Sequence, residues 1–465
     1  MVNQVALSRR QLLRIGLGFS GVAFLAACSS AAPASPTAAP TQPAAAAVAA
    51  TATTAPAAAA APATMGVAIT VSTRGAGDGD IMIKTADAFS KSTGIKVTHV
   101  SYGPEPDYWA KVEATFATKQ LADVVWASTG NLFNFANRKI LRELDSVIKA
   151  DNYDLSDYVP NALKTLTFKG TLVAMPWGAH PGNGGLLYNA DMLNAAGFAK
   201  VTDNAESILD WTYDMVMQAA QKTLKRTGDS TDVYGFSTGT DYLSLTNVVS
   251  SYGADFINAD GTKLTMDTPE FLKGMNWIRD VFVTAKLAPA PGANGDQLFD
   301  GQKLATEASG FWGQFQPGIK DNAFKWNCGL APLGPANKRG THLTINGQAM
   351  AATTTHDKEA WQFIKYLMAP EQNVQIVLAN GGRPAARKAV LESPILLEKM
   401  KAMKVWAKGI SEAEPWRQPS NYRWPEFNTT ITNVFADAWI GKQTVEQALP
   451  NAMKLLQAVL DKPPV

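Results

Sequence analysis

Cysteine and histidine are scarce in this sequence, with two Cys and four His among 465 residues. Two cysteines do not support a disulfide framework, and no CxxC pair or Cys/His spacing typical of a zinc site is present. The histidines, His99, His180, His342 and His356, are widely separated, so no metal site is predicted. Cys328 is expected to be a small buried residue.

Clusters of basic residues are also absent from most of the chain. Of the 42 Lys and Arg, Arg9, Arg10 and Arg14 lie in the first 28 residues, which contain no acid, so 39 basic residues face 40 acidic ones beyond Cys28. Nucleic-acid binding depends on clustered Lys and Arg that neutralise phosphates. The sequence therefore predicts a near-neutral body and argues against nucleic acid as a partner.

The first 28 residues have the order of a secretory signal: a basic start, an apolar run of about 13 residues and small residues at the end. The run is too short to span a membrane, which takes about 20 apolar residues. Ser8–Leu13 resembles a twin-arginine export signal with Gln11 at its fourth position, and Leu25–Cys28 resembles the bacterial lipobox. We expect cleavage before Cys28 and a lipid on its sulfur. The alternative is an ordinary buried cysteine in a short helix.

Residues 29–64 contain no charge and no aromatic ring, only Ala, Pro, Thr, Ser, Gln and one Val. Such a segment buries too little apolar surface to offset the entropy of ordering, and its prolines favour extended conformations. We predict a disordered Ala/Pro/Thr tether that holds a globular body off the outer side of a bacterial membrane.

Strand-like and helical patterns alternate from Val67 onward. "VAITVS", "IKVTHV" and "ADVVWAS" are typical of strands, whereas "IMIKTADAFSKSTG", ended by Gly94, and "YWAKVEATFATKQ" have helical spacing. A further helix is expected from Thr212 to Gly228, and the chain after Thr355 should be largely helical. This order predicts an α/β fold with a parallel sheet, whose ligands bind beyond the carboxyl ends of the strands.

One short motif suggests an enzyme. Gly235, Ser237 and Gly239 form the G-x-S-x-G pattern of a nucleophile elbow. Only His342 and His356 follow it, and neither stands in a loop that suggests a triad, so a simple turn is favoured. A secreted hydrolase that uses Ser237 or paired carboxylates stays as an alternative.

A glycine-rich stretch follows the first expected strand. Gly75, Gly77 and Gly79 resemble a dinucleotide loop, but Asp80 stands where G-x-G-x-x-G needs glycine. A turn that lines a cleft is therefore expected, and no cofactor is predicted.

Tryptophan is plentiful, with twelve in the chain, and several stand beside turns: Trp126, Trp177, Trp312, Trp416 and Trp424. An indole offers a flat apolar face and one N–H donor, which suits a ligand with apolar faces and polar edges, such as a pyranose ring. The alternative for each ring is packing in a core or between domains.

The chain resembles the family 1 extracellular solute-binding proteins of ABC importers, which include maltose- and oligosaccharide-binding proteins. Eight segments carry the resemblance: "FSKSTGIKV", "ADVVWAS", "GGLLYNADMLNAAGF", "YGF", "EASGFW", "KEAWQFIKYLMAPEQN", "GGRPA" and "GKQTVEQAL". The resemblance implies the type II periplasmic-binding-protein fold, with two α/β lobes, three hinge crossings and a ligand cleft between the lobes. The crossings would lie near 184–187, 333–340 and 382–384. One lobe would combine 66–184 with 335–382, and the other 185–334 with 383–465.

The resemblance also implies site residues. Trp126, Tyr242, Trp312 and Trp424 match positions of sugar-stacking aromatics in maltodextrin-binding members, whereas "PWGAHPGNGG" departs from the pattern of those members. The full set of candidate ligand-binding residues is Arg74, Asp78, Trp126, Ser128, Trp177, His180, Asn183, Asp241, Tyr242, Trp312, Arg383 and Trp424.

The expected function is that of a monomeric, extracytoplasmic lipoprotein anchored to the bacterial cell membrane through Cys28. It would capture a mono- or oligosaccharide, close around it, and deliver it to the permease subunits of an ABC importer, without catalysis. In the alternatives, the same fold binds a phosphorylated polyol, a polyamine or a peptide, with Arg74 and Arg383 as partners of a phosphate, or the protein is the hydrolase described above.

Overall fold

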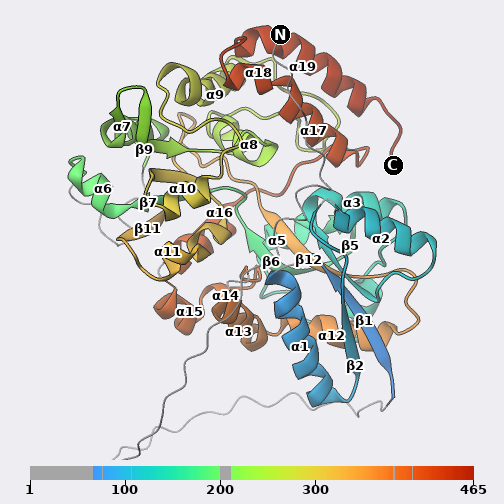
Figure 1. Ribbon diagram of the computed structural model, residues 1–465. Coiled ribbons are helices and arrows are strands. Elements are labelled where there is room, and N and C mark those ends of the chain that lie inside the picture. Colours follow the sequence, from blue (N-terminus) through green and yellow to red (C-terminus); the bar gives the residue numbers. More distant parts are fainter. Residues whose placement is uncertain (1–65, 76, 106, 199–210, 381–382, 401) are drawn as a thin grey trace, which may run out of the picture. The chain divides into compact units, whose positions relative to one another are not determined.

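Two separate five-stranded sheets organise the described part of the chain (Figure 1). The computed structural model describes residues 66–75, 77–105, 107–198, 211–380, 383–400 and 402–465. The described elements all belong to one compact unit of the chain. The predicted signal peptide with Cys28 and the predicted tether (29–64) lie outside the described residues, as does part of the crossing predicted near 382–384.

The first sheet has the strand order β2-β1-β3-β12-β6. Its strands are β1 (Ala68–Thr73), β2 (Lys96–Ser101), β3 (Val124–Ser128), β6 (Met175–His180) and β12 (Thr344–Met350). β1 runs parallel to β2 and β3, as predicted, but β12 runs antiparallel to β3 and β6. The sheet is therefore mixed and not wholly parallel, because β12 enters it late in the chain and from the opposite end.

Helices cover the first sheet. They are α1 (Gly77–Thr93), α2 (Asp107–Ala117), α3 (Thr129–Asn137), α4 (Asp145–Ala150), α5 (Pro160–Thr165), α12 (Asp357–Met368) and α13 (Pro370–Asn380), with a hairpin of β4 (Thr167–Phe168) and β5 (Thr171–Leu172). α1 ends where predicted, because Gly94 takes a φ of 76°, which favours glycine. Gly77 and Gly79 begin α1, so the predicted glycine turn is wrong beyond Gly75.

The second sheet has the order β11-β7-β10-β9-β8. Its strands are β7 (Gly185–Asn189), β8 (Lys225–Thr227), β9 (Ser230–Ser237), β10 (Leu304–Ser309) and β11 (Trp326–Leu330). β10 is parallel to β9, whereas β7 is antiparallel to both β10 and β11. Every residue of β7 and β11 is buried, including the predicted buried thiol of Cys328, as expected for strands covered on both faces.

The elements around the second sheet come from two parts of the chain. They are α6 (Ala190–Ala195), α7 (Tyr213–Thr223), α8 (Tyr242–Ser251), α9 (Pro269–Arg279), the π-helical turn Asp280–Thr284, α10 (Gly295–Asp300), the 3-10 turn Phe311–Phe315, α11 (Pro317–Lys320), α17 (Trp424–Val434), α18 (Ala436–Trp439) and α19 (Val445–Leu460). Thr212 caps α7 by accepting the N–H of Met215, as predicted. The predicted end at Gly228 is wrong, because Lys225–Thr227 forms β8 and pairs with β9.

The chain passes from the first sheet to the second between β6 and β7, and returns between β11 and β12. Past Arg383 it stays on β6 at first, where the N–H of Ala179 donates to the carbonyl of Pro384 (2.8 Å). α14 (Lys388–Leu391), α15 (Pro394–Lys399) and α16 (Met403–Glu412) follow, and α16 contacts β6, β7 and β11. The residue boundaries given above for the two lobes stay predictions.

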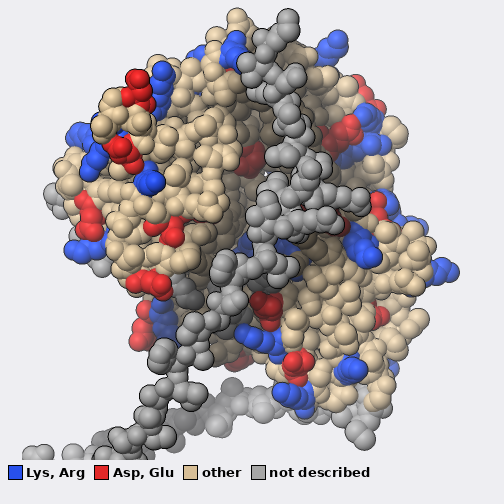
Figure 2. All heavy atoms as spheres, in the orientation of Figure 1, with Lys and Arg blue, Asp and Glu red and all other residues tan. Residues whose placement is uncertain are grey.

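The described surface carries both signs of charge. In Figure 2, Lys and Arg lie among Asp and Glu over the visible described surface, consistent with the near-neutral body predicted from composition. Within the described ranges, no helix combines the length and the apolar character that a membrane crossing requires.

Candidate functional site

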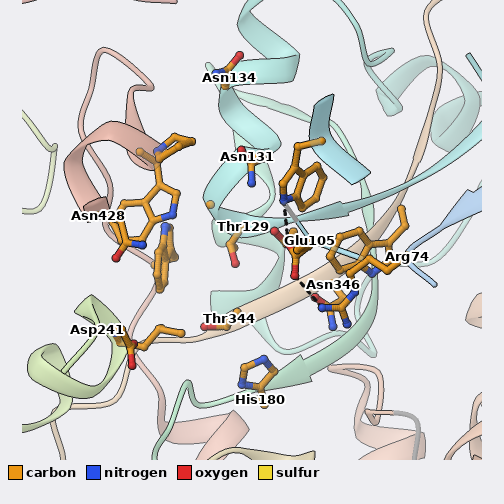
Figure 3. A pocket seen from close by; sticks show the side chains of 18 of the residues that line it. Arg74, Glu105, Thr129, Asn131, Asn134, His180, Asp241, Thr344, Asn346 and Asn428 are labelled. Atoms are coloured by element: carbon orange, nitrogen blue, oxygen red, sulfur yellow. Dashed lines mark hydrogen bonds and ion pairs between the residues drawn. The ribbon is translucent and has the colours of Figure 1, made fainter. Parts of the chain in front are cut away.

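A cavity of about 860 Å³ is lined by side chains from both groups of elements. β1, β3 and β6 reach it at their carboxyl ends and β12 at its start, which is the edge predicted for ligands. α2, α3, α17 and the loop before α8 add further parts of the wall. In Figure 3, Asn131, Thr129 and Asn346 point into the same space as Asp241 and Asn428, which come from the other side.

The wall combines aromatic, uncharged polar and ionisable side chains. It contains five indoles, several amides and hydroxyls, a histidine and five charged groups. The indoles are Trp109, Trp126, Trp312, Trp416 and Trp424, and the amides are Asn131, Asn134, Asn346 and Asn428. The hydroxyls are Ser128, Thr129, Thr344 and Thr429, and the remaining polar groups are Arg74, Glu105, Glu113, His180, Asp241 and Arg383.

Arg74 follows β1 directly and is neutralised within the protein. Its guanidinium contacts Asp78 Oδ2 (2.6 Å) and Glu105 Oε2 (2.8 Å), and Glu105 also accepts the indole N–H of Trp109 (2.8 Å) (Figure 3). Burial lowers the pKa of Arg74, but the two carboxylates outweigh it and raise that pKa above its ordinary value. Asp78, a predicted ligand contact, lies outside the cavity wall and holds Arg74 instead.

Trp126 lines the cavity, but little of its ring is open to a ligand. Trp109 stacks on it (4.9 Å between ring centres, 23° between planes), and the guanidinium carbon of Arg74 lies 4.3 Å from its ring centre. The side chain is 1% exposed, and its indole N–H has no partner in the described part of the chain. The more exposed ring here is that of Trp109, which the sequence analysis did not identify.

Trp424 and Trp416 line the opposite wall, edge to face with ring centres 4.8 Å apart. Tyr242, a predicted stacking residue, is fully buried behind Trp424, 4.7 Å away between ring centres, and does not reach the cavity. Burial raises the pKa of Tyr242 well above its ordinary value. Tyr242 points away from the cavity because it is the first residue of α8 and packs inward against Phe256.

His180, Trp312 and Arg383 form one corner of the cavity. The imidazole meets the Trp312 ring edge to face at 5.2 Å, and the guanidinium carbon of Arg383 lies 5.6 Å from the same ring centre. Burial, with the charge of Arg383, lowers the pKa of His180 to about 3. Its Nδ1 lies 3.0 Å from the carbonyl oxygen of Gly182. Because a carbonyl only accepts, Nδ1 carries the proton, which leaves Nε2 as an acceptor.

Two other predicted site residues lie away from the cavity. Trp177 is buried in β6, and its carbonyl accepts the amide of Asn373 (3.1 Å). Asn183 lines a neighbouring cavity of about 390 Å³ and donates to Ser244 Oγ (2.7 Å). Asp241 lines both cavities while it caps α8 by accepting the N–H groups of Leu243 (2.9 Å) and Ser244 (3.3 Å).

The neighbouring cavity holds Ser237 and two acids, the buried Glu307 and the half-buried Asp296. Burial, and then the proximity of Asp296, raises the pKa of Glu307 well above its ordinary value. The residues that line this cavity include no histidine to activate Ser237. His342 instead lies 3.6 Å from Asp255 and 3.7 Å from Glu414. Across the described residues, no three His, Cys, Asp or Glu side chains are grouped so as to hold a metal ion.

The sequence analysis did not identify the four asparagines of the cavity, because nothing in the composition of the chain distinguishes them. Asn131 and Asn134 stand three residues apart near the start of α3, and so share the helix face that meets the cavity. A pattern of paired amides just after a buried strand would have pointed to them. Glu105 precedes Trp109 by four residues, a spacing that permits the observed hydrogen bond.

Comparisons with known proteins agree with this architecture. Residues 84–405, more than half of the chain, match the family described as bacterial extracellular solute-binding protein. An arabinooligosaccharide-binding protein of Halalkalibacterium halodurans is 25% identical over 300 residues, a match that covers 60% of this chain and 64% of that protein. The chain thus spans less than two thirds of that relative's length.

Two solved structures share the fold. The ABC substrate-binding protein Lmo0181 of Listeria monocytogenes, in complex with cycloalternan, is 20% identical with a TM-score of 0.72, over 85% of this chain and 99% of that one. A solute-binding protein of Thermotoga lettingae bound to α-D-tagatose is 21% identical with a TM-score of 0.72, over 85% and 100%. The fold is thus the two-lobed one that the resemblance implied, and the chain belongs to the family of bacterial extracellular solute-binding proteins.

Proposed function

We propose that this protein captures a carbohydrate in the 860 Å³ cavity and delivers it to the permease of an ABC importer. The observation that carries the proposal is the combination of indole faces with amide and hydroxyl groups in a single cavity. A pyranose ring has apolar C–H faces and a polar rim, which require those two kinds of partner side by side.

Polar atoms without partners support the same conclusion. Trp126 Nε1, Trp416 Nε1 and Thr344 Oγ1 are buried and have no hydrogen-bond partner in the described part of the chain, yet all three residues line the cavity. Buried polar groups are almost always hydrogen-bonded, so a ligand hydroxyl that reaches these atoms would supply the missing partner. Leaving them unpaired would penalise an analogue that lacks the matching hydroxyl.

The arrangement of the wall supports capture by closure. Arg74 and Asn346 stand on the side of the first sheet, whereas Asp241 and Trp424 stand on the side of the second. A ligand that contacts both sides stabilises the closed arrangement over an open one. We propose that the lobes are 66–184 with 335–382 and 185–334 with 383–465, and that the segments between the sheets form the hinge.

The family is extracellular, so the cavity works outside the cytoplasm. Within that location, we propose export by a twin-arginine-like signal, lipid attachment at Cys28 and a tether over 29–64 that leaves a monomeric body free to reach the permease. The relative named as arabinooligosaccharide-binding and the structures with bound cycloalternan and tagatose support a carbohydrate as the ligand. The absence of histidine beside Ser237 supports binding without hydrolysis.

Isothermal titration calorimetry with a panel of mono- and oligosaccharides tests the proposal. Trp424 and Trp277 are both 8% exposed, but only Trp424 lines the cavity. We expect Trp424→Ala and Trp277→Ala both to lower the melting temperature, and Trp424→Ala alone to weaken binding. Failure of the folded wild-type protein to bind any saccharide, or equal affinity in both variants, would contradict the proposal.

A further inference from the structure

The charged side chains of the cavity differ in how they are neutralised. Five of them line it: Arg74, Glu105, Glu113, Asp241 and Arg383. Arg74 and Glu105 pair with each other, and Asp78 adds a second carboxylate. Glu113 pairs with Arg138 (2.9 Å). Asp241 accepts two backbone N–H groups of α8 and the hydroxyl of Ser244 (3.0 Å).

Arg383 is the exception among these five. In the described part of the chain its guanidinium has no ion pair and no hydrogen bond, and its Nε is buried without a partner. Its guanidinium carbon lies 5.6 Å from the centre of the Trp312 ring. Burial lowers the pKa of Arg383 to about 10, with partial compensation from the more distant Asp78. At neutral pH the group is still charged, and the half-buried side chain has lost part of its hydration without gaining an ion pair in the described part of the chain.

The backbone holds Arg383 firmly in this position. The N–H of Ala179 donates to the carbonyl of Pro384 (2.8 Å), and the buried amide of Asn373 binds both the carbonyl of Trp177 (3.1 Å) and the N–H of Ala385 (2.9 Å). Gly178 permits the close approach, since a Cβ there would lie 3.0 Å from Arg383 Cβ. The backbone at Arg383 therefore cannot move away from the cavity without breaking these contacts with β6 and Asn373.

The neighbouring groups favour a negative charge on a hydroxylated ligand. Gly178, beside Arg383, pairs with Asn346, which pairs with Ser128 at the start of α3. Ser128, Thr129 and Gly130 at the start of α3 line the cavity, so the positive end of that helix dipole lies at the cavity wall. His180 is neutral and offers Nε2 as an acceptor, which suits a hydroxyl next to the anionic group.

We infer that the ligand is an acidic saccharide, whose carboxylate or phosphate group binds Arg383 in the corner formed with His180 and Trp312. The inference rests on the proposed carbohydrate function and narrows it to anionic sugars. The planar guanidinium can bind either anion through two parallel hydrogen bonds. A neutral sugar would leave this half-buried charge without an anionic partner.

The test compares matched neutral and acidic sugars by calorimetry with the full mature chain. D-glucose is set against D-glucuronate and D-glucose 6-phosphate, D-galactose against D-galacturonate, and xylobiose against its glucuronic-acid-substituted form. The carboxylate and phosphate members separate the two sources of negative charge. The variants are Arg383→Gln, Arg383→Lys and the control Arg226→Gln, which removes one exposed charge outside the cavity. Melting temperatures check that each variant is folded.

We expect an acidic member to bind wild type about 10- to 100-fold more tightly than its neutral match, the range for hydrogen bonds to charged groups. The ratio should fall below about threefold in Arg383→Gln, stay intermediate in Arg383→Lys and persist in Arg226→Gln. If neutral sugars bind as tightly as acidic ones, or if the preference survives in Arg383→Gln, the inference is wrong while the carbohydrate function stands. If folded wild type binds none of these sugars, the carbohydrate function fails and the inference fails with it.

Discussion

Gly130 offers a direct test of closure, because it lies where the two sides of the cavity meet. It stands in the first turn of α3, and the indole of Trp424 on α17 packs on it. A Cβ at this position would lie 2.5 Å from Cδ1 of Trp424 and would also overlap Nε1. Ordinary contact begins near 3.4 Å, so Gly130→Ala requires a displacement of about 1 Å between α3 and the indole.

The indole cannot make this movement freely. Trp416 and Tyr242 meet Trp424 edge to face at 4.8 and 4.7 Å between ring centres. Overpacking of this kind costs about 1–3 kcal/mol. If the clash exists only when α3 and α17 are together, it falls on the closed arrangement alone, and ligand affinity should drop by about 5- to 150-fold. The melting temperature of the ligand-free protein should change little, because the open arrangement relieves the clash.

Calorimetry with the best-binding saccharide, together with thermal unfolding, measures both quantities. Gly75→Ala is the matched control, because its Cβ would lie 3.6 Å from Ser101 Oγ, at ordinary contact distance. We expect normal affinity for the control and weakened binding for Gly130→Ala. Affinity within twofold of wild type for folded Gly130→Ala would refute the view that contact of α3 with Trp424 accompanies binding. A lower melting temperature with unchanged affinity would refute it equally.

Four further changes test other parts of the structure. Trp312→Ala should weaken saccharide binding by about 2- to 12-fold through loss of one aromatic face, measured by calorimetry. Burial and Asp296 raise the pKa of Glu307, so the stability that its protonated form contributes is present at low pH and is lost as pH rises through that pKa. Glu307→Gln should therefore have a higher melting temperature than wild type above about pH 4.5. Cys28→Ser should move the protein from the membrane to the soluble fraction, and retention on the membrane would contradict the anchor. Ser237→Ala should leave chromogenic ester and glycoside assays at background, as in wild type.

Local patterns predicted the elements whose ends are set locally. α1 ends before Gly94 because the backbone turns there into a left-handed conformation, and α7 begins after Thr212 because the hydroxyl of that residue caps it. The end of α7 could not be predicted in this way. Lys225–Thr227 has residues that continue a helix, and only the distant partner β9 makes it a strand. The antiparallel entry of β12 likewise depends on where the chain returns from the second sheet.

The site shows the same division between local and tertiary causes. Arg74 and Trp312 follow strands, at positions where side chains meet the cavity in any fold of this class. Tyr242 also follows such a loop, but it turns away because α8 begins at that residue and buries its ring. Trp109 reaches the cavity from within α2. It does not stand beside a turn, so the pattern that identified the other tryptophans did not identify this one.

Arg74 and Arg383 could not be distinguished from the sequence. Each is a single basic residue in a short glycine-containing loop, and the sequence analysis names both as candidate ligand-binding residues and, in the alternative of a phosphorylated ligand, as partners of its phosphate. The contacts separate them, because Arg74 is neutralised by Asp78 and Glu105, whereas the guanidinium of Arg383 lies over the ring of Trp312 and has no ion pair among the described residues. The nature of the ligand therefore depends less on how many charges reach the cavity than on which of them the protein leaves unpaired.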